Sequence, residues 1–212
     1  MDYVFSIPQE QEEFIGQLIE AMADFSPETY AHLLNTAEIA LTLCEYLNLD
    51  TQSAQTLYLA ALVHDVGKGA IDPKILHNPH ITAEEFAQIK KHPIYTKMLL
   101  KDNLPKEIVD ICHHHHEMPN GKGYPQGLVE SELSELDKML SVCDVTSALI
   151  LPRSYKKPFT REEVKSILID KGLKGELDKN YVAAVIDCYV ATNEFVKDEE
   201  GYTSHSDQGM SL

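Results

Sequence analysis

The chain has 212 residues, 43% of them apolar and 25% charged, which is enough for one domain with a substantial hydrophobic core. Its formal net charge of −16 argues against a nucleic-acid polymer or an anionic membrane surface as partner, because proteins bind these anionic partners through positively charged side chains. No signal peptide is recognisable, no run approaches the roughly 20 apolar residues that span a bilayer, and the four cysteines lack CxxC spacing, so we expect a reduced, cytoplasmic protein.

Helical periodicity accounts for almost the whole chain. The predicted helices cover about 9–24, 27–47, 51–67, 82–90, 93–100, 105–116 and 131–151, a stretch from 160 onward, and about 178–197. Several begin with recognised signals: Pro27 stands at a first helical position, and Thr82 and Thr160 each form a capping box with a glutamate three residues later. Proline and glycine predict loops at 73–79 and 118–128.

No alternating pattern of useful length indicates a strand, and no internal repeat or linker divides the chain. We therefore predict an all-α fold, a helical bundle of about seven to nine helices. Within it we expect an N-terminal helix (residues 1–25) packed on one domain (26–198). The polar segment 199–212 is expected to be disordered.

The first candidate for chemistry is His64-Asp65, which follows the apolar stretch LYLAALV and precedes Gly67-Lys68. Imidazole and carboxylate together are ligands for zinc, iron, manganese or nickel. Adjacent helical residues diverge by about 100°, yet both can contact one ion, or one ion each of a pair, at a helix end. Taken alone, the dipeptide equally fits a buried hydrogen-bonded pair.

Four other segments carry similar residues. Glu28 and His32 are four apart and share a helix face, although a surface pair has the same spacing. His92 precedes a proline at a helix start, where it could also serve as a cap. At most two members of the run His113–His116 can face one site. Asp144 lies in the apolar segment MLSVCDVTSALIL, where an ionised carboxylate is costly unless it is paired or metal-bound. One shared site with several ions explains all of these segments most economically.

The stretches HDVGKGAIDPKILHNPHITAEEFAQIKKHP and HHHEMPNGKGYPQGL resemble the HD superfamily of phosphohydrolases and, within it, the HD-GYP group. The resemblance covers about Thr29 to Arg161, and Gly123-Tyr124-Pro125 with its preceding His-His-Glu is specific to that group. It implies an HD-domain bundle around two or three divalent ions, iron or manganese first, with nickel, zinc or magnesium as alternatives. It also implies hydrolysis of cyclic di-GMP to pGpG or GMP.

The resemblance assigns the metal ligands by position: Glu28, His32, His64, Asp65, His92, His115, His116 and Asp144, with Glu28 serving a third ion in some members. Asp65 and Lys68 are the expected catalytic residues, Asp65 orienting or accepting a proton and Lys68 adding positive charge at a phosphate oxygen. For the substrate, we expect Gly123, Tyr124 and Pro125 to shape the pocket mouth, with the Tyr124 ring stacking on a base, and Arg153 to bind guanine or phosphate. A plain backbone turn and a surface charge are the respective alternatives.

Three stretches depart from the family pattern. Leu33-Leu34-Asn35-Thr36 replaces an Arg-Val pair and alters what supports His32. Thr146-Ser147-Ala148 replaces Tyr-Asp-Ala, and Arg153-Ser154-Tyr155 replaces Arg-Pro-Tyr, which would change how a guanine or phosphate is held. The alternatives to a cyclic di-GMP phosphodiesterase are therefore an HD-type nucleotidase acting on mononucleotides and a weakly catalytic module. Such a module would bind cyclic di-GMP or dock a protein partner through the GYP loop, the loop that contains Gly123-Tyr124-Pro125.

Overall fold

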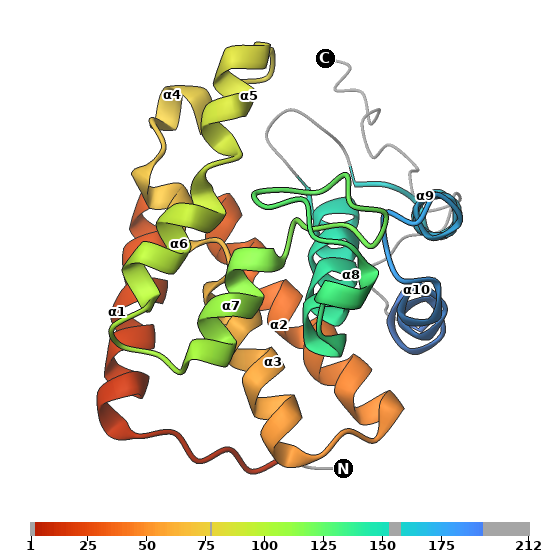
Figure 1. Cartoon of the computed structure of the whole chain (residues 1–212), viewed down its shortest axis with the longest axis horizontal. Coiled ribbons are helices and arrows are strands. Elements are labelled where there is room, and N and C mark those ends of the chain that lie inside the picture. The colour runs from red at the N-terminus through yellow and green to blue at the C-terminus, as the bar shows by residue number, and fades with distance from the viewer. Residues whose placement is uncertain (1–2, 77, 153–157, 193–212) are drawn as a thin grey trace, which may run out of the picture.

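The computed structural model describes residues 3–76, 78–152 and 158–192. Within these ranges the chain is built from helices and carries no strand, only an isolated β-bridge between Asn120 and Val129 (Figure 1). The prediction of an all-α fold is confirmed. Arg153 and the segment 199–212 lie outside the described residues, as do the last positions of the final predicted helix.

The N-terminal half begins with three helices, α1 (Gln9–Phe25), α2 (Pro27–Leu47) and α3 (Thr51–Val63), close to their predicted bounds. The side chain of Ser26 accepts a hydrogen bond from Thr29 N at the start of α2, and Asp50 accepts one from Ser53 N at the start of α3. Helix α3 ends at Val63, earlier than predicted, and a 3-10 helix, η1 (Val66–Ala70), follows. The His-Asp doublet therefore lies at the junction of two helices.

The middle of the chain contains α4 (Pro73–Leu76), α5 (Ala83–Ile89), α6 (His92–Leu100) and α7 (Lys106–His114). The prediction of a plain loop at 73–79 is wrong in one respect, because Pro73 starts the short helix α4, a position at which its missing N–H costs nothing. The predicted capping box at the start of α5 is present, with Thr82 and Glu85 bonded reciprocally.

The C-terminal part contains the 3-10 turn η2 (Glu130–Glu132), α8 (Glu135–Ile150), α9 (Arg161–Leu173) and α10 (Lys179–Val185), which runs into the π turn η3 (Ile186–Val190). Helix α8 starts later than predicted, because Ser134 caps it in a capping box with Asp137. The long loop between α7 and α8 keeps the glycine- and proline-rich character that the sequence indicated.

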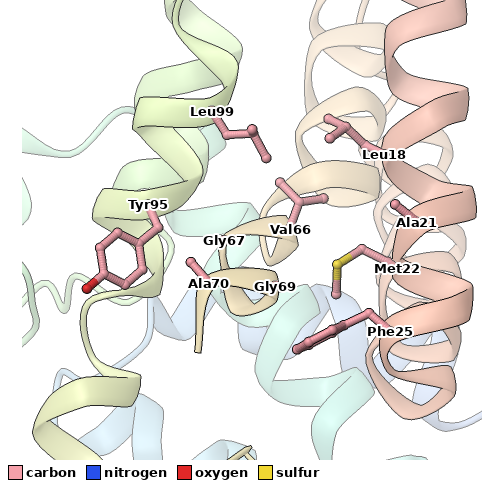
Figure 2. A pocket seen from close by; sticks show the side chains of 10 residues that line it. All are labelled: Leu18, Ala21, Met22, Phe25, Val66, Gly67, Gly69, Ala70, Tyr95 and Leu99. Carbon is pink, nitrogen blue, oxygen red and sulfur yellow. The ribbon is translucent and has the colours of Figure 1, made fainter. Parts of the chain in front are cut away.

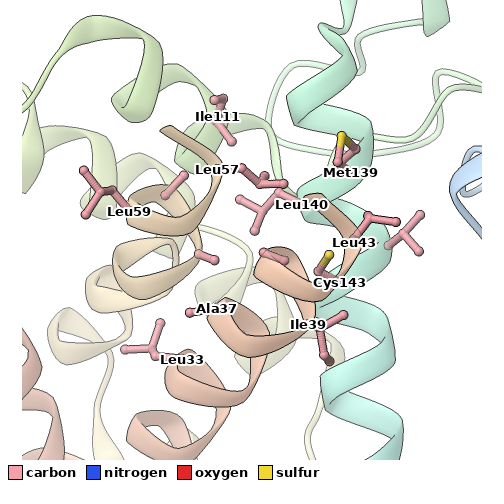
Figure 3. Packing of buried hydrophobic residues seen from close by; sticks show 14 of the residues in the cluster. Leu33, Ala37, Ile39, Leu43, Leu57, Leu59, Ile111, Met139, Leu140 and Cys143 are labelled. Atoms are coloured by element: carbon pink, nitrogen blue, oxygen red, sulfur yellow. The ribbon is translucent and has the colours of Figure 1, made fainter. Parts of the chain in front are cut away.

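The hydrophobic core lies between α2, α3, α7 and α8 (Figure 3). Leu43, Leu57, Ile111 and Leu140, one from each helix, are buried side chains of this core. Helix α1 adds Ile15 and Met22 to the same core, so it packs on the rest of the fold, while the division of the chain at residue 26 stays a prediction. In the part of the chain that the structure describes, no helix has the length and apolar character to cross a membrane.

Candidate metal centre

Seven histidine and aspartate side chains from α2, α6, α8 and the ends of α3 and α7 converge in the bundle. Their ligand atoms form two groups, with the atoms of each group within 4.8 Å of one another. One group consists of Asp65, His92, His115 and His116, and the other of His32, His64 and Asp144. Six of the seven residues are buried and His116 is half-buried. The structure thus brings together seven of the eight ligands that the sequence predicted.

The carboxylate of Asp65 joins the two groups. Its Oδ1 lies 3.0 Å from His92 Nε2 and 3.6 Å from His115 Nε2. Its Oδ2 lies 3.5 Å from His64 Nε2 and 3.6 Å from His32 Nε2. One carboxylate oxygen therefore faces each group.

Asp144 joins the groups in the same way from α8. Its Oδ1 lies 2.9 Å from His32 Nε2 and 3.7 Å from His64 Nε2. Its Oδ2 lies 3.7 Å from His116 Nδ1. The two groups therefore share both carboxylates, which is an arrangement suited to two neighbouring cations.

Helix ends fix the orientation of three of the imidazoles. The Nδ1 atoms of His64, His92 and His115 lie 2.9, 2.7 and 2.6 Å from the carbonyl oxygens of Ala61, Ile89 and Cys112, each three residues earlier. These carbonyls belong to the last turns of α3, α5 and α7, where a helix leaves backbone acceptors unpaired. Since a carbonyl can only accept, Nδ1 carries the proton in each ring, and Nε2 presents a lone pair to the cluster.

A close contact between η1 and α6 holds the His-Asp doublet in place. Thr96 Oγ1 donates a hydrogen bond to His64 O at 3.0 Å and accepts one from Gly67 N at 2.9 Å. A Cβ atom at Gly67 would lie 2.2 Å from His92 O, so only glycine permits this approach. The glycine of the HDVGK stretch therefore sets the distance between Asp65 and His92.

The two carboxylates of the centre are ionised despite their burial. Burial raises the pKa of Asp65, but the ammonium group of Lys68, hydrogen-bonded to its Oδ2, and the neighbouring His64 hold that pKa well below its usual value. Burial likewise raises the pKa of Asp144, but the neighbouring imidazoles, His32 and His64 first, hold that pKa well below its usual value. The centre therefore offers negative charge to a cation.

Most of the imidazoles are held neutral, as metal ligands must be. Burial lowers the pKa of His32, lowers that of His92 to about 4, and lowers that of His116 well below its ordinary value. His64 is the exception, because the nearby Asp65 raises its pKa against the effect of burial.

The hydrogen bonding of the cluster indicates that its residues fit a metal ion. His64 Nε2 and Asp65 Oδ1 are buried without a hydrogen-bond partner among the described residues. His92 Nε2 and His115 Nε2 lie 3.2 Å apart, although both rings already use their protons at Nδ1. Lone pairs therefore face one another, which is costly unless a cation lies between them. Imidazole and carboxylate are the donors that first-row transition metals prefer.

The other predicted residues lie in varied positions. Glu28 is half-buried in the first turn of α2, one turn before His32, and its carboxylate does not belong to either group of ligand atoms. Lys68 bonds Asp65 at the edge of the centre, where its side chain is 17% exposed. Arg153 lies outside the described residues, so its predicted contact with substrate stays a prediction.

The histidine run divides as the helix geometry requires. His115 and His116 enter the cluster, whereas His113 Nδ1 bonds Pro93 O at 3.1 Å and His114 Nδ1 lies 3.3 Å from Asp137 Oδ1. Two members of the run therefore lie in the cluster, within the limit of two that helix geometry predicts.

The GYP loop lies against the cluster. The Tyr124 ring centroid is 4.8 Å from that of His116, with the planes tilted by 37°, and Lys90 Nζ is 5.0 Å from the tyrosine ring. Tyr124 N donates to His116 O, and the Tyr124-Pro125 peptide bond is cis. Both the turn and the aromatic surface expected from the sequence are therefore present, while stacking of Tyr124 on a substrate base stays a prediction.

Glu117 anchors this loop, and its role was not predicted from the sequence. Its carboxylate is buried and accepts hydrogen bonds from the backbone N–H groups of Gln126, Gly127 and Leu128 at 2.5, 3.2 and 2.9 Å. The available signal was its place between the histidine run and a loop rich in glycine, whose backbone needs acceptors. Gly123 approaches the Glu117 backbone so closely that a Cβ atom would lie 2.5 Å from the Glu117 Cα.

Ser147 was assigned by sequence to a stretch that affects substrate binding, but the structure places it at the metal centre. It is fully buried on α8, and its Oγ lies 2.9 Å from His32 Nδ1. Its neighbour Thr146 is also fully buried and bonds its own helix at Val142 O. At its Ser147 position, the departure from Tyr-Asp-Ala therefore contacts His32, one of the predicted metal ligands.

A separate apolar pocket of about 470 Å³ lies between α1, η1 and α6 (Figure 2). Leu18, Met22 and Phe25 of α1 face Val66 and Leu99 across it. The cluster side chains do not line this pocket, so it is distinct from the candidate metal centre.

Comparisons with known proteins agree with this geometry. A family model described as HD domain matches residues 16–180. The cyclic di-GMP phosphodiesterase PA4108 of Pseudomonas aeruginosa is 36% identical over 138 residues, which is 64% of this chain and 33% of that protein. The 3'3'-cGAMP-specific phosphodiesterase 1 of Vibrio cholerae is 28% identical over 174 residues, 81% of this chain and 40% of that protein.

Among solved structures, Bd1817, an HDG"Y"P protein from Bdellovibrio bacteriovorus, has the same fold, with a TM-score of 0.64. The match is 20% identical and covers 84% of this chain and 61% of that one. At that identity the likeness concerns the fold alone. The chain spans about a third to two fifths of the length of the two curated relatives, whose additional parts have no counterpart in these matches.

Proposed function

The chain belongs to the HD domain family, and we propose that it is a metal-dependent phosphodiesterase that hydrolyses cyclic di-GMP to pGpG or GMP. The family was expected from His64-Asp65 together with the Gly123-Tyr124-Pro125 segment.

The observation that carries the proposal is the set of lone pairs that face one another in the cluster. Asp65 Oδ1 lies 3.0 Å from His92 Nε2, yet neither atom has a proton to share, because His92 donates from Nδ1 to Ile89 O. Such a contact repels in the absence of a cation and becomes favourable when one binds. A merely structural histidine would instead direct its nitrogens at donors and acceptors.

We propose that the centre holds two or three divalent ions, with iron or manganese as the first choice. Two ligand groups that share the carboxylates of Asp65 and Asp144 support at least two ions, and Glu28 near His32 is the residue that a third would use. When bound, such ions lower the pKa of coordinated water toward neutrality and offset the negative charge of a phosphate.

Side chains around the centre then position the substrate. Lys68 stands between the buried Asp65 and solvent, so its ammonium group can donate a hydrogen bond to a phosphate oxygen while remaining paired. Asp65, whose pKa is held well below its usual value, stays ionised and accepts hydrogen bonds throughout. Tyr124 covers one side of His116 and offers the face of its ring at the edge of the site.

The substrate class follows from the relatives and from the charge of the chain. Relatives named for cyclic di-GMP and for 3'3'-cGAMP share a cyclic dinucleotide, a small dianion that a metal centre can bind even in a protein of net charge −16. We propose that Arg153 contributes a guanine or phosphate contact and that the GYP loop is the surface for any protein partner. We also propose the cytoplasm as its location, in line with its free cysteines.

The test combines metal analysis with a substrate panel. Protein purified with Mn²⁺ or Fe²⁺ retained should contain about two or more ions per chain and convert cyclic di-GMP to pGpG or GMP, faster than it hydrolyses mononucleotides. Asp65→Ala should lose turnover. His115→Gln should lose metal and turnover, whereas the matched variant His114→Gln, which changes the neighbouring histidine outside the cluster, should keep both.

Three results would contradict the proposal. Metal-loaded protein that cleaves no phosphodiester would exclude the enzymatic function, and tight binding of intact cyclic di-GMP would then favour a binding module. Turnover of mononucleotides in preference to cyclic dinucleotides would favour a nucleotidase. Full activity of Asp65→Ala would exclude the centre as the site of reaction.

A further inference from the structure

We propose that Ser147 is a positioning residue that lets His32 carry its proton on either ring nitrogen, Nε2 without metal and Nδ1 with metal, and thereby determines how tightly the centre binds metal. The inference rests on the proposed metal centre and concerns a position at which this chain departs from the family pattern. Ser147 lies three residues after Asp144 on α8, so both side chains project from one face of that helix. They hold the two nitrogens of one imidazole, Asp144 at Nε2 and Ser147 at Nδ1, each at 2.9 Å.

His32 needs such a partner because of its place in α2. His64, His92 and His115 lie at or beside helix ends and bond carbonyls that the helices leave unpaired. His32 lies in the second turn of a 21-residue helix, where the preceding carbonyls are engaged by the helix itself. A side chain from another helix must therefore fix its orientation, and Ser147 supplies it.

A hydroxyl differs from a carbonyl because it can either accept or donate. Ser147 Oγ also lies 3.4 Å from His32 O, so its proton can be directed to that carbonyl. In this arrangement Ser147 Oγ accepts a hydrogen bond from His32 Nδ1–H, and His32 Nε2 carries a lone pair that can bind a metal ion. When the hydroxyl rotates, it donates to Nδ1, and Nε2–H donates to Asp144 Oδ1 instead.

The two arrangements correspond to the two states of the site. The second satisfies His32 fully in the metal-free protein, which the fixed tautomers of His64, His92 and His115 cannot achieve. Metal binding then requires His32 to change tautomer, a change that the serine hydroxyl can follow by rotating. A carboxylate at position 147 could only accept, so it would hold His32 in the ligand form permanently.

The proposal predicts a graded series of Mn²⁺ affinities, measured by calorimetry on the full chain with Mn²⁺ as the probe. Ser147→Ala should weaken binding by about 10- to 100-fold, Ser147→Thr should stay close to the unaltered protein, and Ser147→Asp should bind more tightly than it. Thr146→Val is the matched control, because it removes a buried hydroxyl of the same helix that donates its hydrogen bond to Val142 O. Its Mn²⁺ affinity should not change.

A second readout does not depend on any variant. Histidine ¹⁵N chemical shifts should show His32 protonated at Nε2 in the metal-free protein and at Nδ1 after loading with Zn²⁺, while His64 and His115 keep the proton at Nδ1 in both states. Unchanged protonation of His32 would overturn the proposal, as would Mn²⁺ binding by Ser147→Ala that equals the unaltered protein. An equal loss in Thr146→Val would show that α8 is merely weakened. Failure of every form, the unaltered protein included, to bind Mn²⁺ would instead reject the metal centre itself.

Discussion

Replacing Gly67 with alanine tests whether the contact between η1 and α6 sets the geometry of the centre. A Cβ atom there would lie 2.2 Å from His92 O, 2.4 Å from Thr96 N and 2.6 Å from Thr96 Oγ1, whereas ordinary contacts begin near 3.4 Å. Two of the three atoms are backbone, so no side chain can rotate to relieve the overlap. Helix α6 must move away by about 1 Å, and backbone shifts forced by overpacking typically cost about 1–3 kcal/mol.

That movement has consequences for the site as well as for stability. Thr96 loses its hydrogen bonds with Gly67 N and His64 O. His92 Nε2, which lies 3.0 Å from Asp65 Oδ1 in the unaltered protein, moves away from that carboxylate. We expect Gly67→Ala to lower the melting temperature by several degrees, to weaken Mn²⁺ binding, and to reduce turnover by about 100-fold, the effect of a 1 Å misplacement. Thermal unfolding, calorimetry and the cyclic di-GMP assay measure these quantities.

The neighbouring glycine is a matched control. A Cβ atom at Gly69 would meet only Met22 Sδ, at 3.8 Å, so Gly69→Ala should fold and bind Mn²⁺ as the unaltered protein does. If Gly67→Ala also melts and binds like the unaltered protein, then α6 does not pack against η1 at this distance. The account of how His92 is positioned would then be wrong.

Three further predictions concern the loop, the buried histidine and the lysine. Glu117→Ala should destabilise the protein by about 1–3 kcal/mol, because three backbone N–H groups of the GYP loop lose their acceptor. The variant should also raise KM with little change in Mn²⁺ content. An unaltered KM would speak against the role of Glu117 as the anchor of this loop. The metal-free protein should lose about 3 kcal/mol of stability as the pH falls from about 6.5 toward 4. In this range His92 binds a proton in the unfolded chain but stays neutral in the folded protein, where burial lowers its pKa to about 4. Urea unfolding at pH 7 and pH 4.5 measures the loss, which His92→Gln should reduce. Lys68→Met should lower kcat/KM by about 100-fold while the ions are retained, and Lys97→Met, which breaks a surface pair with Asp110, should not.

The histidines and aspartates that converge in the candidate centre could be picked out from the sequence because their chemistry is unusual for their surroundings. A carboxylate such as Asp144 in an apolar helix is costly without a charged partner, and a His-Asp doublet after a buried helix is unusual for the same reason. Helix starts were predictable where a side chain caps the first turn, as at Thr82 and Thr160. These signals are local, so one sequence is enough to find them.

The features that the sequence did not predict depend on contacts between distant segments. Glu117 meets its three donors only because the loop turns back on itself, with Gly123 close against the Glu117 backbone. Ser147 meets His32 across 115 residues of sequence. The early end of α3 and the short helix at Pro73 reflect packing against α6 and local capping, which periodicity does not report.

The placement of the ligands at helix ends explains why this fold can hold so many imidazoles in fixed orientations. A histidine that follows the last turn of a helix can bond a carbonyl that the helix does not use, so its tautomer is set by the backbone and needs no dedicated partner. His64, His92 and His115 obtain their orientation in this way from the ends of α3, α5 and α7. At each of these positions a histidine alone is enough, because the backbone supplies its partner. Of these four histidines, only His32 lies within a helix and takes a side chain, Ser147, as the partner of its Nδ1. Variation among related chains in metal affinity should therefore be concentrated at position 147, where the partner is a residue that substitution can change.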